Sequence, residues 1–160
     1  MVNIEVTRSP VVVRRGTTDG TPLGSSGRAR LKVYNEPDGD SGYALIEGSH
    51  PAGEPRIRDH VHARHEETFL VVEGHYQMRI GDEVVVANAG DYVFVPRGTA
   101  HTYRNLGPAP GRVVNIMSPA DGAELLVELG ALAGGPVSDE VLTEIHARHS
   151  AVLVDPLPGW

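Results

Sequence analysis

The 160-residue sequence contains no cysteine, one lysine and no long apolar run. Without cysteine, disulfides, thiolate zinc sites and iron–sulfur clusters are excluded, so any bound metal must be held by nitrogen and oxygen ligands. The formal net charge is -7, Lys32 is the only lysine, and no basic run occurs. This balance argues against binding to nucleic acid or to anionic membrane surfaces.

The same absences bear on localisation. No apolar stretch approaches the roughly 20 residues that a membrane span requires. Residues 1–6 lack the charged region and long apolar run of a signal peptide, and the lack of cysteine fits a reducing compartment. We therefore expect a cytoplasmic protein that does not enter a membrane. By length, we expect residues 1–160 to form a single domain that can bury a core.

Glycine and proline, 19 and 12 residues, punctuate short runs of β-branched and aromatic residues. Short strands at roughly 8–12-residue spacing predict an antiparallel sandwich or barrel. The Gly-, Ser- and Thr-rich stretch 16–27 predicts a loop. The predicted strands cover residues 11–14, 31–34, 42–47, 56–62, 68–73, 76–80, 83–86, 92–95, 101–104, 112–117 and 151–154.

The hydrophobic periodicity changes after these strands. The segment Ser118-Pro119-Ala120-Asp121 has an N-cap residue, a proline at the first helical position and an acid three residues after the cap. Gly134-Gly135-Pro136 ends this helix, and Ser138-Asp139-Glu140 begins a second one. We expect a barrel core over about 30–117 and helices over about 118–149, with the helices packed on the barrel or on a partner subunit in a structural role. After the predicted start of the first helix, leucines recur at helical spacing, at Leu125, Leu126, Leu129 and Leu132.

Three histidines and three carboxylates lie close together in the segment 59–69. His60 and His62 are two residues apart, so both imidazoles project from the same face of an extended strand. Glu67 follows at the head of the next apolar strand. Two imidazoles and a carboxylate that converge from adjacent strands predict a metal site in need of a fourth ligand, which we assign to His101.

A second pattern runs from Gly90 to Asn105. Gly90 permits a tight turn into the strand 92–95, and Pro96 and Gly98 end that strand and redirect the chain. His101 is then delivered on the return strand, and Asn105 closes the following turn.

Residues 53–74 resemble the first signature motif of the cupin superfamily, and residues 90–105 resemble its second motif without a mismatch. In the first motif, six residues rather than the usual five separate Gly53 from His60. The flanking pattern is similar to that of small single-domain bacterial cupins, which include quercetinase-like proteins. The resemblance implies an all-β fold, a double-stranded β-helix or jelly-roll barrel of two antiparallel sheets, with a short C-terminal helical appendage.

The resemblance also implies one divalent transition metal ion per chain (Fe, Ni, Mn, Cu or Zn), bound inside the barrel by His60, His62, Glu67 and His101. Such a set leaves open positions on the ion, which then acts as a Lewis acid toward an enolate, phenolate or carboxylate and leaves room for O₂. Glu67 can also leave the metal and act as the catalytic general base, since a barrel interior raises the pKa of a carboxylate. The alternative is a cupin that keeps the fold without a metal.

The other histidines have no predicted ligand role. We expect His65 and Glu66 on the turn between the ligands, either facing solvent or contacting the ligands. A register with Glu66 in place of Glu67 is the alternative. No ligand spacing relates the remaining histidines, which are His50, His75, His146 and His149. The last two could bind a surface metal, but we expect a solvated helix end.

Strand parity places three candidate substrate-binding residues, Arg58, Phe69 and Tyr103, on the faces that carry the predicted ligands. For Phe69, and more so for Val71 beside it, core packing is the alternative. A buried arginine needs a partner, so Arg58 either pairs internally or binds an anionic or phenolic substrate.

Three functions fit these observations. The first, implied by the resemblance to quercetinase-like cupins, is a metal-dependent dioxygenase acting on a small enolic, phenolic or carbonyl-containing molecule. The second is a non-redox cyclase, isomerase or lyase of the polyketide-cyclase kind, in which the metal is only a Lewis acid. The third is a non-enzymatic small-molecule-binding cupin. Because small cupins commonly pair through their outer sheets, we also expect a homodimer.

Overall fold

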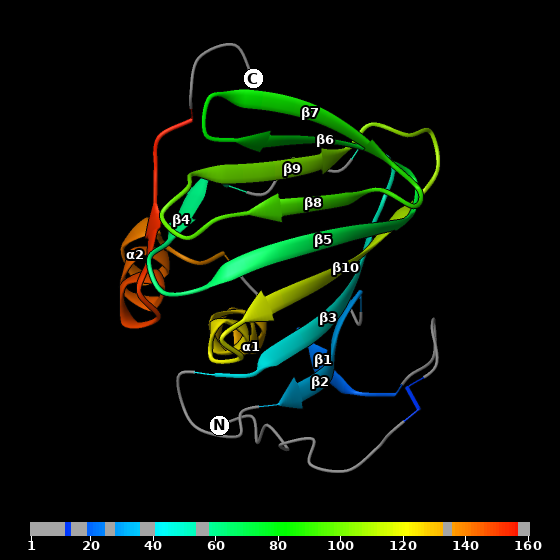
Figure 1. The fold of residues 1–160 in the computed structure, drawn as a ribbon. Helices are drawn as coiled ribbons and strands as arrows, with labels where there is room; N and C mark the ends of the chain where they lie inside the picture. The colour runs from blue at the N-terminus through cyan, green and yellow to red at the C-terminus, as the bar shows by residue number, and fades with distance from the viewer. Residues whose placement is uncertain are drawn as a thin grey trace.

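The computed structural model describes residues 12–13, 19–24, 28–35, 41–53, 58–132 and 136–156. These residues form two antiparallel sheets, with two helices at the end of the sheets where the last long strand finishes (Figure 1). The strands are β1 (Thr21–Leu23), β2 (Ala29–Asn35), β3 (Tyr43–His50), β4 (His60–His62), β5 (Glu66–Glu73), β6 (His75–Ile80), β7 (Glu83–Asn88), β8 (Tyr92–Val95), β9 (His101–Asn105), β10 (Gly111–Ser118) and β11 (Ala151–Leu153). The helices are α1 (Gly122–Ala131) and α2 (Asp139–Arg148).

The chain passes repeatedly from one sheet to the other. The six-stranded sheet runs β1-β2-β3-β10-β5-β8, and the five-stranded sheet runs β11-β4-β9-β6-β7. Consecutive strands such as β4 and β5 therefore lie in different sheets, whereas β4 and β9 are neighbours, with His60 opposite His101. This confirms the predicted all-β double-stranded β-helix with a short helical appendage. No helix in the described ranges has the length and apolar character needed to cross a membrane.

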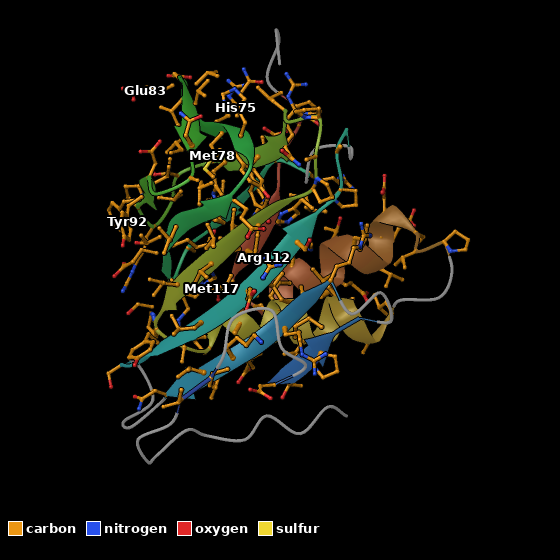
Figure 2. All side chains as sticks on the ribbon, turned by 90° about the vertical axis from the view of Figure 1, so that its right-hand side faces the viewer. His75, Met78, Glu83, Tyr92, Arg112 and Met117 are labelled. Carbon is orange, nitrogen blue, oxygen red and sulfur yellow. The ribbon has the colours of Figure 1, made fainter. Side chains whose placement is uncertain are left out.

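Two apolar clusters fill the interior, and their members alternate along the strands as period-two side-chain placement requires. One cluster joins the two sheets and includes Phe69, Val71 and Met78. The other joins the six-stranded sheet to α1 and includes Met117, which Figure 2 labels together with Met78. Val71 is fully buried, which agrees with the core-packing alternative for that residue.

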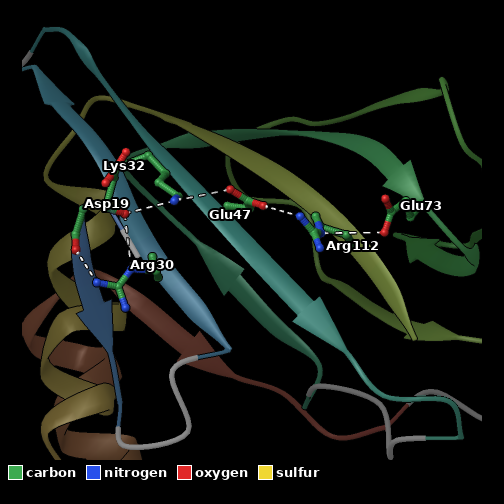
Figure 3. A network of polar contacts seen from close by, with 7 residues as sticks. Asp19, Arg30, Lys32, Glu47, Glu73 and Arg112 are labelled. Carbon is green, nitrogen blue, oxygen red and sulfur yellow. Dashed lines mark hydrogen bonds and ion pairs between the residues drawn. The ribbon is translucent and has the colours of Figure 1, made fainter. Parts of the chain in front are cut away.

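The opposite face of the six-stranded sheet carries a row of charged side chains that crosses four strands (Figure 3). Glu47 lies at its centre, 3.0 Å from Arg112 and 3.5 Å from Lys32. Arg112 continues the row to Glu73 at 3.8 Å, and Lys32 donates a hydrogen bond to the Asp19 carbonyl. Opposite charges on neighbouring strands stabilise the pairing of β2, β3, β10 and β5. This explains the position of the single lysine.

The turn between β5 and β6 requires a glycine, and the neighbouring turn is closed by an asparagine. Gly74, between β5 and β6, has φ +102°, and a Cβ there would lie 2.8 Å from the Gly111 Cα. Only glycine fits this backbone conformation and close approach. Beside it, the amide of buried Asn105 donates to the carbonyl of Ala109 at 2.8 Å and its oxygen accepts from the Gly107 N–H at 3.0 Å. Asn105 therefore closes the turn as predicted.

The first helix begins later than predicted. Ser118 is the last residue of β10, and its hydroxyl donates to the Gly42 carbonyl at 3.0 Å. Strand pairing of Ser118 with Glu66 takes precedence over capping, and Asp121 is the N-cap of α1. The predicted cap at Ser118 is therefore wrong. The predicted start of the second helix is confirmed, because the Ser138 hydroxyl oxygen accepts a hydrogen bond from the Val141 N–H.

The N-terminal region also differs from the expectation. The stretch 16–27, predicted as a loop, contains β1, whose Leu23 is buried against the core. Long-range pairing of β1 with β2 overrides the local turn-forming composition. Of the strand predicted over 11–14, residues 12 and 13 are described and do not form a strand, so the prediction is wrong there, and residues 11 and 14 lie outside the described residues.

Candidate metal centre and the pocket beside it

The four residues predicted as metal ligands meet in one cluster inside the barrel. His60 and His62 come from β4, Glu67 from the start of β5 and His101 from the start of β9. One donor atom from each lies within 4.8 Å of the others. His60 is partly exposed, whereas the other three side chains are buried. Three nitrogen donors and one oxygen donor are thus gathered from three strands.

Backbone carbonyls set the tautomers of two of these histidines. His60 Nδ1 donates to the Arg58 carbonyl at 2.7 Å, and His101 Nδ1 donates to the Thr99 carbonyl at 3.0 Å. In each ring this leaves Nε2 as the atom directed to the cluster. Both ring nitrogens of His62 are buried and have no hydrogen-bond partner among the described residues. A metal ion would satisfy a nitrogen whose burial is otherwise unfavourable.

The charges in the cluster also fit a divalent ion. Burial, followed by the positive charge of His101, lowers the pKa of His60 to about 4. Burial lowers the pKa of His62 to about 2. Both imidazoles are therefore neutral near pH 7, with lone pairs available for coordination.

Glu67 and His101 form a buried ion pair, with Oε2 and Nε2 3.0 Å apart. Burial alone would raise the pKa of Glu67, but the hydrogen bond and charge of His101 outweigh it and lower the pKa to about 2. Burial likewise opposes protonation of His101, but Glu67 raises the pKa of that imidazole overall. The expectation that the barrel interior raises the pKa of Glu67 is therefore wrong, because the neighbouring imidazoles stabilise the carboxylate.

Asn115 and His65 complete the surroundings of the carboxylate. Asn115, from β10, donates its amide N–H to Glu67 Oε1 at 3.1 Å. The sequence motifs did not indicate Asn115, although its parity between the buried residues Val113 and Met117 places it inside the barrel. His65 Nε2 lies 3.9 Å from the same oxygen, without a hydrogen-bond partner among the described residues.

His65 is packed against the cluster instead of facing solvent. It is 2% exposed, and its ring centroid lies 4.0 Å from that of His62. Gly122, the first residue of α1, makes room for it, since a Cβ there would lie 2.7 Å from the ring. Of the two placements predicted for His65, contact with the ligands is the one observed. Glu66 lies outside, where it accepts a hydrogen bond from Arg97.

A cavity of about 220 Å³ opens beside the cluster, and its lining has two parts. We call the first the barrel wall, formed by Arg58, His60, His62, Glu67, Phe69, Tyr103, Asn115 and Met117. We call the second the helical wall, formed by Leu125, Leu126 and Leu129 of α1, Leu142 and His146 of α2, and Leu153 of β11. The C-terminal helices, predicted to have a structural role, thus also line the pocket.

The three candidate substrate-binding residues all line this cavity, in different ways. The Phe69 and Tyr103 rings are 5.2 Å apart, and the Tyr103 hydroxyl contacts His50 Nε2 at 3.2 Å. Arg58 is half exposed, and its Nη1 lies 2.8 Å from Asp139 Oδ1 at the start of α2. Arg58 is thus paired within the chain, but the pair is exposed, so the expected burial of Arg58 is wrong.

Two histidines without a predicted role occupy the interior. His50 bridges two tyrosines, because its Nδ1 lies 3.0 Å from the Tyr76 hydroxyl while its Nε2 contacts Tyr103. His146 is 8% exposed and lines the cavity, so the expected solvated helix end is wrong at this residue. Strand parity could have indicated His50, which shares a face of β3 with buried Ile46. For His146, the position of α2 is needed, and no local pattern gives it.

Comparisons with known proteins agree with this geometry. Residues 49–117 match the family model described as "Cupin domain". A stretch of 110 residues, 69% of the chain, is 32% identical to quercetin 2,3-dioxygenase of Bacillus subtilis and covers 32% of that protein. Another, of 46 residues (29% of the chain), is 39% identical to an uncharacterized protein of Aquifex aeolicus and covers 38% of it. The chain therefore spans about a third of the length of these curated relatives.

Solved structures extend the similarity to the fold. A Bacillus halodurans protein is similar with a TM-score of 0.56 and 20% identity, over 69% of this chain and 82% of that one. An uncharacterized Klebsiella pneumoniae protein with a double-stranded β-helix domain gives a TM-score of 0.52 and 22% identity, over 68% of this chain and 92% of that one.

Proposed function

This chain belongs to the cupin superfamily, and on that premise we propose that it is a metal-dependent enzyme, a dioxygenase of the quercetinase-like kind, acting on a small enolic, phenolic or carbonyl-containing molecule. The observation that carries the proposal is that three of the four donors, His60, His62 and Glu67, form part of the wall of an apolar cavity. A ligand in this cavity can therefore reach the donors. Similarity to a quercetin 2,3-dioxygenase supports the choice of reaction.

The donor set suits one divalent first-row ion, whether Fe, Ni, Mn, Cu or Zn. His60, His62 and His101 would hold it through nitrogen, and Glu67 through a carboxylate oxygen. When bound, the ion keeps open coordination positions and polarises an oxygen of the substrate. A proton lies between Glu67 Oε2 and His101 Nε2 and must leave this pair when the ion is held, so metal uptake releases a proton.

The remaining barrel wall orients the substrate and excludes water. Phe69 is 2% exposed and packs beside Tyr103, so both aromatic rings offer apolar contact to the ring of a ligand. Asn115 holds the Glu67 carboxylate in place through its amide. With a pKa of about 2, Glu67 is a weak base, and its proposed catalytic role is to retain negative charge at the cluster.

The test uses purified protein loaded separately with each of the five metals. Oxygen consumption is measured on a flavonol and on single-ring enols, with His62→Ala as the control. The proposal expects metal-dependent uptake that the variant lacks. If no metal supports uptake and a carbonyl substrate is instead isomerised or cyclised, the non-redox alternative replaces it. A chain that binds no metal overturns both enzymatic functions and leaves a binding role.

We also propose that the protein is a cytoplasmic homodimer. Tyr92 and Phe94 on edge strand β8 are 70% and 58% exposed, and Tyr92 projects from the outside of the molecule in Figure 2. Exposed apolar surface of this kind often marks an interface between proteins. Light scattering at micromolar concentration should give the mass of a dimer, and a monomer would overturn the proposal.

A further inference from the structure

The helical wall contains one polar side chain among five leucines. That side chain is His146, on the last turn of α2, and it is 8% exposed. The leucines come from α1, α2 and β11 and offer a ligand only apolar contact. Any polar selectivity on this side of the cavity therefore depends on His146.

The hydrogen bonding of His146 fixes what it can offer. Its Nδ1 donates to the Leu142 carbonyl one turn earlier, at 2.7 Å. Nε2 then carries the lone pair, and it has no hydrogen-bond partner among the described residues. Burial lowers the pKa of His146 more than the Leu142 bond raises it, so the ring is neutral near pH 7. Nε2 is thus an acceptor in a wall otherwise made of leucines, and a donor on the ligand can satisfy it.

The size of the cavity limits the ligand. Its volume of about 220 Å³ exceeds the roughly 150 Å³ of a cavity that holds benzene. It is below the range of about 300–1,000 Å³ typical of sites for drug-sized ligands. A single substituted ring fits within this volume, whereas a flavonol with three rings would extend beyond it.

We propose that the pocket selects a single-ring enol or phenol with a second hydroxyl group, and that this hydroxyl donates a hydrogen bond to His146 Nε2. The inference rests on the proposed function, because the first oxygen of the ligand must face the metal held by the barrel wall. It adds the size of the substrate and the polar group by which the helical wall recognises it.

The test compares two ligands that differ by one hydroxyl, 5-hydroxy-2-hydroxymethyl-4-pyranone and its 2-methyl analogue. Zinc-loaded protein is used, because zinc does not turn over the ligand by redox chemistry. The zinc content is measured first, and ligand binding is then measured by calorimetry. We expect the hydroxymethyl compound to bind about 10-fold more tightly, as one hydrogen bond to a buried acceptor implies. His146→Leu should reduce this ratio to about 1.

Two further variants separate recognition from packing. His146→Gln places an amide near the position of Nε2 and should keep part of the preference. His149→Gln is the matched control, because His149 lies on the same helix, bonds to Glu128 at 2.7 Å and does not line the cavity. It should keep the full preference. Circular dichroism reports whether each variant is folded.

A measurement on the unaltered protein does not depend on any variant. With ¹⁵N-labelled histidine, the Nε2 resonance of His146 should shift with the hydroxymethyl compound and not with the methyl compound. An unchanged resonance, an unchanged ratio in His146→Leu, or tighter binding of a flavonol than of either pyranone would each overturn the inference. In all three results the protein still binds zinc. They can therefore be distinguished from a failure of the proposed function in which the protein retains no metal.

Discussion

The two walls of the pocket differ in chemistry and in how they are held. The barrel wall contains three of the four metal-donor side chains that meet within 4.8 Å, and the fourth, His101, lies opposite His60 on the neighbouring strand. Backbone carbonyls fix the rings of His60 and His101. The helical wall presents five leucines and one imidazole from the two helices and β11. Because the same donor set can serve several reactions, the donors alone do not determine the reaction. Under the proposed function, the helical wall selects the molecule that reaches them.

The second helix is attached by fewer buried contacts. Its buried residues are Ile145 and His146, whereas α1 also packs on the six-stranded sheet through Ala123 and Val127. The rest of the attachment of α2 includes polar contacts, such as the Arg58–Asp139 pair and the bonds from Arg148 and His149 to Glu128. Segments with few buried contacts open at lower free energy than core strands. We therefore expect α2 to open before the barrel, which gives ligands a route to the pocket.

The largest expected effect follows from removing one donor of the barrel wall. His62→Ala deletes a buried imidazole whose ring nitrogens have no hydrogen-bond partner among the described residues, so metal content should fall from about one ion per chain to nearly none. Elemental analysis after dialysis measures this. His75→Ala, at an exposed position on β6, is the matched control and should retain its metal. Full metal content in His62→Ala would show that the cluster is not the site.

The helical wall should respond in stability and ligand size, not in metal content. Leu125 is 2% exposed and belongs to the cluster that joins α1, α2 and β11. Leu125→Ala should lower the free energy of unfolding by about 2–5 kcal/mol, measured by urea denaturation. It should also enlarge the cavity enough to admit bulkier rings. Val152→Ala, 59% exposed on β11, should change stability by less than about 0.5 kcal/mol. Loss of metal in Leu125→Ala would contradict the division between the walls.

The walls also differ in how far the sequence predicts them. Barrel strands and ligands follow from short-range rules, since parity places His60 and His62 on one face and turn residues deliver His101. The helical wall depends on how α2 docks. Leu125 has the same apolar periodicity whether it faces a core or a cavity, and His146 at the end of a helix gives no local sign of burial. The charge states of the ligand side chains are also hard to predict from the sequence, because their pKa values depend on burial and on neighbours from other strands.

Acid should destabilise the metal-free barrel wall. The pKa values of His60 and His62 are about 4 and about 2 in the folded chain, against 6.5 when unfolded. Below pH 6.5 the unfolded chain therefore binds protons that the folded chain does not, and stability falls with pH. Between pH 7 and pH 5 the loss should be about 3 kcal/mol. Urea denaturation in the presence of a chelator measures it.

Two other groups shape this profile. The raised pKa of His101 acts in the opposite sense, because its contribution is fully present below pH 6.5 and is lost as pH rises through the folded pKa. Glu67, with a folded pKa of about 2, loses its contribution only as pH falls from about 4.5 toward 2. A metal-free chain equally stable at pH 5 and pH 7 would mean that the imidazoles of β4 are not held neutral.

A smaller effect is expected where the two walls meet. Gly122 begins α1 directly under the His65 ring, and an added Cβ would lie 2.7 Å from ring atoms. Gly122→Ala should therefore destabilise the chain by about 1–3 kcal/mol, although alanine is otherwise the better helix former by about 1 kcal/mol. The double variant with His65→Ala relieves the clash and should be less destabilised than the two single effects predict. A Gly122→Ala chain more stable than its parent would place the helix farther from the cluster.

The smallest effect is expected for the ion pair that connects the walls. Arg58 and Asp139 are 2.8 Å apart, but their side chains are 51% and 81% exposed, so solvent screens their attraction. A double-mutant cycle with Arg58→Ala and Asp139→Asn should give a coupling energy of about 0–1 kcal/mol that decreases with salt. The cycle is needed because Asp139 also lies in the first turn of α2, where its charge stabilises the helix by itself. A coupling above about 2 kcal/mol would exceed what exposed pairs contribute. The helical wall would then be fastened as firmly as the barrel, and hydrogen exchange in α2 would be as slow as in β5.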